Sequence, residues 1–361
     1  MIGLFMALGL LAISPCTANA RIHERNSVLP SLSGTPVDMT SSQGGTYPRA
    51  NFLSDGTLLG AYATTVEDNK QLVLVKSSDS GETWSLLGTA ATRPTNASDL
   101  DNSYPLQLPG GRVLLAYRNH DKDPVSGDYT AFRIDISYSD NNGATWAYLS
   151  TPASMPGGPD FTPGIWEPFL RNAKDGSLQL YYSKENSQDD QDTIERISSN
   201  GGADWGDELT ISGQDLTSRD GMTGVAQIDG KQLIAVFESR QGGTFQIDSI
   251  TSADDGTTWG NRQIVYLPTG TGNNAGAPQV VDVGGTLCVS FMTDEDTQLH
   301  DWVNGAGAKL ITSGDGGATW GRKIEVFSPQ TVWPGVVALD DTSFLYMADK
   351  NGAKSQKIVL S

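Results

Sequence analysis

Residues Ser77 to Trp84 read SSDSGETW, and the pattern Ser-x-Asp-x-Gly-x-Thr-Trp returns four more times along the chain. The further copies are Ser139–Trp146 (SDNNGATW), Ser198–Trp205 (SSNGGADW), Ser252–Trp259 (SADDGTTW) and Ser313–Trp320 (SGDGGATW), the first two with Asn at the Asp position. Their tryptophans fall 54–62 residues apart. This spacing is typical of one four-stranded blade with its loops, so the pattern indicates a repeat protein.

Each copy has the composition of a tight hairpin. Asp or Asn accepts backbone N–H groups within a turn, Gly takes a positive-φ position, and Trp packs between neighbouring hairpins. The pattern resembles the Asp-box of sialidase-type propellers, which joins the third and fourth strands of a blade. We therefore assign the five copies a structural role and no catalytic one.

A second repeat predicts the number of blades. Six segments combine a turn with an apolar strand: 54–62 (SDGTLLGAY), 109–117 (PGGRVLLAY), 174–182 (KDGSLQLYY), 229–237 (DGKQLIAVF), 284–292 (GGTLCVSFM) and 340–348 (DDTSFLYMA). The 361 residues include 41 Gly and 17 Pro, and no long helix-period segment stands out. The sequence thus predicts an all-β fold, a sialidase-like six-bladed β-propeller with Asp-box hairpins.

The N-terminus predicts export. Residues 1–20 (MIGLFMALGLLAISPCTANA) contain an apolar run that ends in the small-residue pattern of a signal peptidase site. We expect residues 1–20 to be a signal peptide and residues 21–361 to form a single propeller that is secreted to the extracellular space. Cleavage would remove Cys16 and leave only Cys288, so the mature chain cannot form an internal disulfide. The net charge of −18 disfavours nucleic acid and anionic membranes as partners.

Two glutamates are expected at the mouth of the central channel. In an up-and-down blade the first strand starts and the second strand ends at the same end of the channel, where a small ligand can be surrounded. Glu167 follows Trp166 in an apolar stretch, where burial raises the pKa of a carboxyl, which suits a general acid. Glu238 ends the apolar strand 233–237, with Arg240 close enough to keep it ionised, which suits a nucleophile.

Two such carboxyl groups can hydrolyse a glycosidic bond. One protonates the leaving oxygen, and the other attacks or stabilises the anomeric carbon. Both glutamates could instead be ordinary rim charges, but their aromatic and apolar surroundings on adjacent blades favour catalysis. In a retaining enzyme the two carboxyl groups lie about 5–5.5 Å apart, against roughly 6.5–9.5 Å in an inverting one. The first range is our prediction for Glu167 and Glu238.

The segments around these glutamates resemble the family 93 glycoside hydrolases, fungal exo-1,5-α-L-arabinanases. The resemblance lies in the stretches 47–50 (YPRA), 164–169 (GIWEPF) and 236–238 (VFE), and it runs from about Tyr47 to the C-terminus. It implies a retaining enzyme that releases arabinobiose from arabinan, the polysaccharide side chains of pectin. It also implies two catalytic glutamates on adjacent blades, here Glu167 as acid/base and Glu238 as nucleophile.

Seven further residues are expected to bind the substrate: Arg49, Tyr104, Arg118, His120, Trp166, Arg240 and Trp333. Each also has a structural interpretation, because an arginine can pair with a rim carboxylate and a tryptophan can fill the channel wall. The acidic runs 189–192 and 294–296 lack the spacing of a calcium loop. We therefore expect no metal and no other cofactor. We also expect the protein to be a monomer.

Two other functions stay open. A sialidase would share the propeller and the Asp-boxes, but it holds the substrate carboxylate with three arginines. Here only Arg49 falls naturally into such a triad, although Arg118, Arg219 and Arg240 could supply the other two arginines. Trp333 stands where a tyrosine nucleophile would be expected. A non-catalytic lectin could use the same mouth only to bind carbohydrate.

Overall fold

The structure, a computed structural model, describes residues 28–40, 44–159, 162–297 and 301–361. The expected signal peptide, residues 1–20, lies outside the described residues. Strands β1 to β24 form six antiparallel sheets of four strands each, and every strand in a sheet pairs with its neighbour in the chain except β1. The predicted all-β, six-bladed propeller is confirmed.

The first three blades follow each other along the chain. Blade 1 contains β2 (Thr46–Phe52), β3 (Leu58–Val66), β4 (Asn69–Ser77) and β5 (Ser85–Pro94). Blade 2 contains β6 (Ser98–Gln107), β7 (Val113–Lys122), β8 (Tyr129–Ser139) and β9 (Ala147–Pro156). Blade 3 contains β10 (Ile165–Asn172), β11 (Leu178–Ser187), β12 (Asp190–Ser198) and β13 (Leu209–Ser212).

The remaining blades close the ring. Blade 4 contains β14 (Gly221–Asp229), β15 (Gln232–Ser239), β16 (Gln246–Ser252) and β17 (Gly260–Tyr266). Blade 5 contains β18 (Ala275–Val283), β19 (Thr286–Thr293), β20 (Gly307–Ser313) and β21 (Gly321–Phe327). Blade 6 contains β22 (Val332–Asp340), β23 (Ser343–Asp349), β24 (Ala353–Leu360) and β1 (Pro30–Asp38). The first strands of neighbouring blades contact each other around the central axis.

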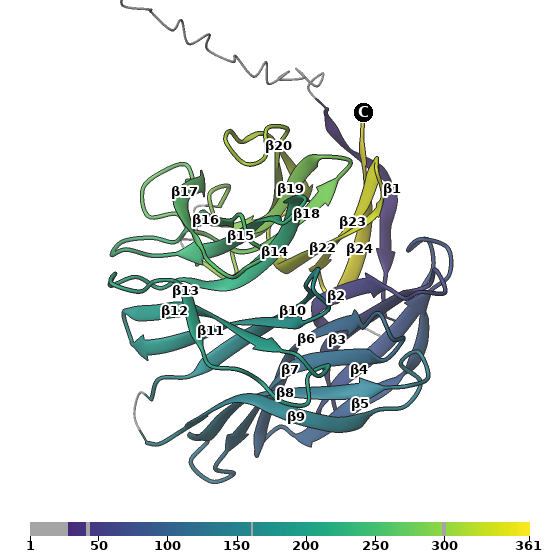
Figure 1. The fold of residues 1–361 in the computed structure, drawn as a ribbon, viewed down its shortest axis with the longest axis vertical. Coiled ribbons are helices and arrows are strands. Elements are labelled where there is room, and N and C mark those ends of the chain that lie inside the picture. The colour runs from purple at the N-terminus through teal and green to yellow at the C-terminus, as the bar shows by residue number, and fades with distance from the viewer. Residues whose placement is uncertain (1–27, 41–43, 160–161, 298–300) are drawn as a thin grey trace, which may run out of the picture.

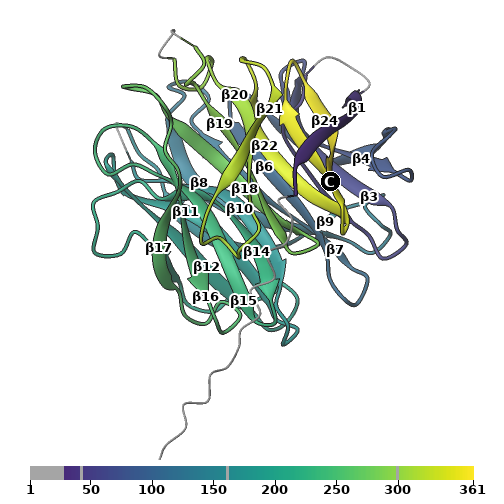
Figure 2. The ribbon, with the colours of Figure 1, turned by 90° about the horizontal axis from the view of Figure 1, so that it is seen from above.

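Both ends of the chain build blade 6. β1 pairs with β24, with Pro30 opposite Leu360 and Val37 opposite Ser355. In Figures 1 and 2 the purple β1 lies beside the yellow β24. Because the outer strand of blade 6 comes from the N-terminus, this blade has no hairpin between its third and fourth strands. Six blades therefore need only five Asp-boxes.

The Asp-boxes have the local structure that the sequence predicts. In the first copy Asp79 Oδ1 accepts the N–H of Thr83 at 2.9 Å, and Ser77 Oγ accepts the N–H of Gly81 at 2.8 Å. The same two bonds recur in the other four copies. Gly81 has a φ of 87°, and a Cβ at this position would collide with Leu345 of blade 6. The glycine is therefore needed for both backbone conformation and close packing.

The core lies between the blades. Each of the six junctions of neighbouring blades holds one cluster of buried apolar side chains. The box tryptophans Trp84, Trp146, Trp205, Trp259 and Trp320 pack at the edges of five of them. Burial of apolar area at these junctions is the main force that holds the ring together.

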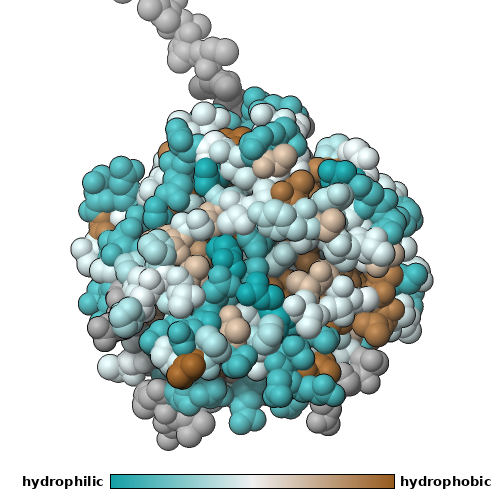
Figure 3. Space-filling model, turned by 90° about the horizontal axis from the view of Figure 1, so that it is seen from below, coloured by the Kyte–Doolittle hydropathy of each residue, from teal (hydrophilic) through white to brown (hydrophobic). Residues whose placement is uncertain are grey.

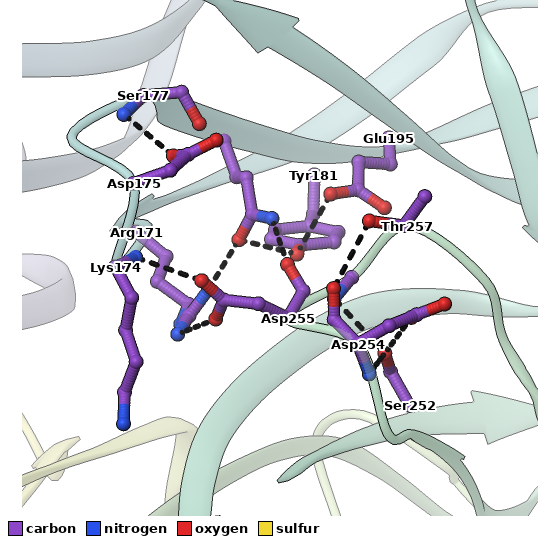
Figure 4. Close-up of polar contacts among 12 residues, drawn as sticks. Arg171, Lys174, Asp175, Ser177, Tyr181, Glu195, Ser252, Asp254, Asp255 and Thr257 are labelled. Carbon is purple, nitrogen blue, oxygen red and sulfur yellow. Dashed lines mark hydrogen bonds and ion pairs between the residues drawn. The ribbon is translucent and has the colours of Figure 1, made fainter. Parts of the chain in front are cut away.

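Polar contacts reinforce the junction of blades 3 and 4 at the box end (Figure 4). Asp255 in the fourth box accepts hydrogen bonds from Arg171 at 2.5 Å and from the N–H of Lys174 at 2.7 Å. Glu195 of β12 accepts from Trp259 Nε1 at 2.8 Å and from Tyr181 at 3.1 Å. This end of the junction is therefore closed by paired polar groups.

The surface carries its large exposed apolar side chains on different blades, among them Leu32, Leu86, Val125, Tyr148 and Ile264. The face seen in Figure 3 is mostly hydrophilic or intermediate, and its apolar residues lie in separate patches. None of the described residues forms a helix with the length and apolarity of a membrane span. Cys288 is a free, buried thiol, as its place in an apolar strand predicts.

Candidate active site

Each blade starts with the same irregularity, a β-bulge in the first strand, where the pairing with the second strand shifts register. One residue in each bulge has a positive φ of 44–57° although none is glycine: Tyr47, Asn102, Glu167, Met222, Ala277 and Trp333. Such backbone is strained in side-chain-bearing residues, and bulges often re-aim side chains at active sites. Glu167 is thus one member of a sixfold ring around the axis.

The sequence around the bulges fits this geometry. Proline follows the positive-φ residue in four of the six blades, as Pro48, Pro168, Pro278 and Pro334. Proline has no N–H to donate to a ladder, so it is tolerated where a bulge interrupts the pairing.

A cavity of about 310 Å³ lies at this ring. Its lining comes from the first strands of blades 1 to 5: Tyr47, Arg49, Asn102, Ser103, Tyr104, Glu167, Pro168, Phe169, Met222, Thr223 and Gln279. The hydroxyl of Ser103 is buried and makes no hydrogen bond to the described residues, whereas the Asn102 side chain interacts with Tyr47. Because buried polar groups are normally paired, the Ser103 hydroxyl is suited to bind a hydroxylated ligand.

Glu167 is the titratable carboxyl of this lining. Its Oε2 accepts a hydrogen bond from Ser183 Oγ at 2.9 Å. Burial and the nearby Glu238 carboxyl raise the pKa of Glu167, Arg118 lowers it, and the resulting pKa is about 7. A group that titrates near neutral pH can both give and take a proton.

Glu238 lies on the adjacent blade at the same end. Glu238 lies opposite Gly221 in the pairing of β14 with β15, and its Oε2 accepts the N–H of Ala277 at 2.9 Å. Burial raises the pKa of Glu238, while the Ala277 N–H and the charge of Arg219 lower it. The structure thus brings the two predicted glutamates into one electrostatically coupled site.

The expected role of Arg240 is corrected. Its guanidinium pairs with Asp189 at 3.3 Å and lies over the ring of Phe245 at 5.2 Å. Its effect on the pKa of Glu238 is smaller than those of burial, Ala277 and Arg219, and the pKa stays above its ordinary value. Arg240 therefore does not hold Glu238 as a direct ion-pair partner.

Arg118 and Trp166 lie beside the cavity. Arg118 pairs with Asp99 at 3.1 Å and with Asp101 at 3.7 Å, and its guanidinium lies 5.3 Å from the centre of the Trp166 ring. Trp166 lines a second hollow of about 610 Å³ together with Tyr129. Arg118 is thus committed to two carboxylates, while Trp166 faces a separate space.

His120 does not reach the cavity. Its side chain is fully buried, packs against Phe132 and Trp166, and accepts the N–H of Arg133 on Nδ1 at 3.0 Å. Burial lowers its pKa to about 3, so the ring is neutral. His120 is not among the residues that line the cavity, because aromatic neighbours enclose its ring.

The other three rim residues lie closer to the axis. Arg49 and Tyr104 line the cavity, and Tyr104 packs on Phe169 with ring centres 4.5 Å apart. Arg49 donates to the carbonyls of Pro48 and Trp333 at 2.9 and 3.1 Å, and no carboxylate of the described residues pairs with it. Trp333 stacks on Tyr47, with ring centres 4.6 Å apart, so its ring supports the cavity wall.

Within the described ranges, no three His, Cys, Asp or Glu side chains gather in a way that could hold a metal ion. The family model of the BNR repeat-like domain matches residues 52–241, more than half of the chain. The chain belongs to this family. No curated protein sequence matches the BNR repeat-like chain.

Solved structures share its fold. The GH93 α-L-arabinofuranosidase of Fusarium graminearum, solved with arabinobiose, is 20% identical with a TM-score of 0.71, covering 90% of this chain and 97% of that one. The α-L-arabinanase of Penicillium chrysogenum, also complexed with arabinobiose, is 20% identical with a TM-score of 0.68, covering 91% and 98%. The NanB sialidase of Streptococcus pneumoniae is 12% identical with a TM-score of 0.57, covering 91% and 70%. These likenesses show the propeller fold of the BNR repeat-like chain.

Sequence reasoning missed several residues of the BNR repeat-like site. Ser103, Thr223 and Gln279 line the cavity, and Ser183 binds Glu167. Met222 and Ala277 follow Glu167 at regular intervals of 55 residues, so an alignment of the blades on Glu167 would have located both bulges. No such periodic signal marks Ser183, because its role depends on contacts between blades.

Proposed function

We propose that this protein is a secreted, retaining glycoside hydrolase, an exo-α-1,5-L-arabinanase that releases arabinobiose from arabinan. The observation that carries the proposal is the pair of half-buried glutamates, Glu167 and Glu238, on adjacent blades at one end of the channel. The pKa of each is raised by burial, and the charge of Glu238 acts on Glu167. Two interacting carboxyls beside a cavity lined by polar groups are what a retaining glycosidase needs for its two steps.

The chemistry assigns a different state to each carboxyl. Glu167, with a pKa of about 7, donates its proton to the leaving glycosidic oxygen. Ionised Glu238, whose Oε2 accepts the Ala277 N–H, attacks the anomeric carbon, and the bond to the leaving oxygen breaks. Glu167, now a carboxylate, takes a proton from water, and the resulting hydroxide displaces Glu238 from the glycosyl-enzyme.

Arabinan is supported by two different observations. The Fusarium and Penicillium proteins that share the fold were both solved with arabinobiose. The cavity also offers uncharged donors and acceptors in Asn102 and Ser103, which suit the hydroxyl groups of a neutral sugar. The proposed partner is therefore arabinan in the side chains of pectin, degraded by a monomer outside the cell.

A sialidase is the second candidate because Arg49 lines the cavity without a carboxylate partner among the described residues. The other candidates for an arginine triad are occupied. Arg118 pairs with Asp99, Arg219 pairs with Glu185 at 2.7 Å, and Arg240 pairs with Asp189. One available arginine favours a neutral substrate over a carboxylate-bearing one.

The test is to incubate the purified mature protein with linear 1,5-α-arabinan and separately with an α-sialoside, and to identify the products. Arabinobiose from arabinan supports the proposal, whereas free sialic acid supports the sialidase. Release of no sugar from either, combined with carbohydrate binding, would leave the lectin hypothesis. N-terminal sequencing of the exported protein should begin at Arg21, and size-exclusion chromatography should give one chain of 38.4 kDa less its signal peptide.

The anomeric form of the first product tests retention separately. NMR of the reaction mixture should show arabinobiose released in the α configuration before mutarotation. Initial release of the β-anomer would contradict the double displacement while leaving glycosidase activity intact.

A further inference from the structure

Ser183 lies between the two blades that carry the glutamates. It is on β11, opposite Trp166 in the pairing with β10, and its side chain is 1% exposed. Its Oγ is 2.9 Å from Glu167 Oε2 on its own blade and 3.0 Å from the backbone N of Met222 on blade 4. A single hydroxyl thus connects the acid of blade 3 to the bulge of blade 4.

The directions of these bonds follow from counting protons. The N–H of Met222 can only donate, so Ser183 Oγ accepts this bond. Among the described residues the hydroxyl proton of Ser183 has Glu167 Oε2 as its acceptor, so this bond runs from Ser183 to Glu167. A carboxyl whose Oε2 accepts in this way carries its own proton on Oε1.

The Met222 N–H is available because of the bulge. The ladder of β14 with β15 is regular at Gly221 and resumes at Gly224, so Met222 lies in the interrupted part with a φ of 54°. A Cβ on Gly221 would come within 2.7 Å of Ser183 Oγ, so the absence of a side chain there permits the close approach.

The same bond recurs in the next blades with different acceptors. The N–H of Ala277 in the bulge of blade 5 donates to Glu238 at 2.9 Å, and that of Trp333 in blade 6 reaches Met292 Sδ at 3.5 Å. Each acceptor side chain lies on the second strand of the preceding blade. There it is opposite the residue that comes just before the positive-φ residue of its own blade. Glu238 therefore receives the bulge N–H directly, whereas Glu167 is linked to one through Ser183.

The fold itself does not require a hydroxyl at this position. The equivalent residues opposite the other bulges are Ala63, Arg118, Glu238, Met292 and Asp349. Since alanine and methionine are accepted in the same backbone setting, the choice of serine in blade 3 points to its side-chain contact with Glu167.

We propose that Ser183 is a positioning residue that fixes Glu167 with Oε1 as its proton-donating oxygen. This inference rests on the proposed function, because it assigns a task within the same glycosidase site. Among the described residues Ser183 is the one that donates a hydrogen bond to Glu167, so Oε1 is left to the leaving group. The charged and titratable groups that act on Glu167 come from four elements: Tyr47 of β2, Arg118 of β7, Glu185 of β11 and Glu238 of β15.

The first test compares Ser183→Ala with Ser137→Ala. Ser137 is a matched control, a buried serine of blade 2 that bonds Tyr117 at 2.9 Å and lies outside the site. With arabinan we expect S183A to lose roughly 10–100-fold in kcat, because a misoriented acid no longer meets the leaving oxygen. With a 2,4-dinitrophenyl arabinobioside, whose leaving group needs no proton, the loss in kcat/KM, which reports only the first step, should be less than about 3-fold, against the same loss of roughly 10–100-fold in kcat/KM on arabinan.

The pH profile supplies an independent readout. The Ser183 hydrogen bond lowers the pKa of Glu167, so its removal should move the alkaline limb of kcat/KM to higher pH. S137A should keep the wild-type profile and leaving-group dependence. Equal losses of S183A on both substrates, an unmoved alkaline limb, or wild-type behaviour would each overturn the positioning role.

A measurement without turnover separates this inference from the proposed function. In protein labelled with 13C at the Glu carboxyls, the Glu167 signal, assigned by its loss in E167Q, should titrate at higher pH in S183A than in wild type. An unchanged titration overturns the Ser183 contact even in an active enzyme. If wild type releases no arabinobiose, the proposed function fails, while the titration still decides whether Ser183 holds Glu167.

Discussion

Two of the glutamates of blade 3, Glu167 and Glu195, have similar pKa values but lie in different surroundings. Burial raises the pKa of both Glu167 and Glu195 to about 7. Glu195 is fully buried at the box end, where Trp259 and Tyr181 each donate a hydrogen bond to it. Glu167 lines the cavity at the other end and receives one hydrogen bond, from Ser183. A raised pKa therefore does not by itself distinguish a catalytic carboxyl from a structural one.

Glu167 and Glu195 differ in whether the polar groups around them are available to bind a ligand. Around Glu195 the donors are protein side chains, and Figure 4 shows Tyr181 and the residues of the fourth box close to it. Around Glu167 the cavity is lined by Asn102 and by the unpaired hydroxyl of Ser103, and the charge of a second carboxyl, Glu238, acts on Glu167. A carboxyl with a raised pKa is identified as the reactive group when it also has access to a substrate and a second carboxyl nearby.

Replacement of each glutamate by glutamine should give the largest separation. E167Q should lower kcat on arabinan by about 10²–10⁴-fold, because the amide cannot protonate the leaving oxygen. E195Q should keep kcat within about 2-fold, since its side chain has no route to the substrate. Initial rates with arabinan, with circular dichroism as a check of folding, decide this.

The two variants also control each other. Both lose one carboxyl of blade 3 whose pKa is raised to about 7, so a general effect of charge removal would appear in both. A similar loss of turnover in E195Q and E167Q would contradict the division between the two ends.

The fold could be predicted because its signals are local. The eight residues of an Asp-box form most of their hydrogen bonds among themselves, as Ser77 and Asp79 do, so a single sequence reveals them. Glu167 could be found for a similar reason, because a charged residue next to Trp166 in an apolar stretch is unusual.

The contacts between blades could not be predicted. Arg240 is near Glu238 in sequence, but its guanidinium pairs with Asp189 on the neighbouring blade. His120 ends a second strand like other mouth residues, but Phe132 and Trp166 enclose it. Side-chain direction at a strand end depends on partners that are distant in sequence, which the residue types around that strand end do not reveal.

The box end should be sensitive to loss of a buried ion pair. Asp255 is 8% exposed and binds both Arg171 and the N–H of Lys174. D255A leaves the Arg171 charge buried without its partner, so we expect a loss of roughly 3–5 kcal/mol in unfolding free energy. Urea denaturation measures this, with D254A of the same box as the exposed control, for which a much smaller loss is expected. Equal losses would contradict a special role of Asp255.

The pH dependence of stability should identify Glu195. An unfolded Glu titrates near 4.5 and folded Glu195 near 7, so between these values the unfolded state loses its proton first. Stability therefore falls as pH rises through this window, by about 3 kcal/mol from this residue, and is constant above it. E195Q has no such proton, and its amide can donate to Tyr181 while accepting from Trp259. The variant should lose this part of the slope, and an unchanged slope between pH 4.5 and 7 would refute the assignment.

The smallest effect is expected when the same exchange of carboxylate for amide is made in an Asp-box. Asp79 accepts the N–H of Thr83 at 2.9 Å, and Asn141 of the second box accepts the N–H of Thr145 at the same distance. Because asparagine already makes this bond in the chain, D79N should change the unfolding free energy by less than about 0.5 kcal/mol, whereas D79A should cost about 1 kcal/mol. Urea denaturation of the two variants checks this. A large loss of stability in D79N would mean that the charge of Asp79, and not its hydrogen bond alone, stabilises the box. The Asp-box would then need its carboxylate, as we expect of Glu167 in the active site.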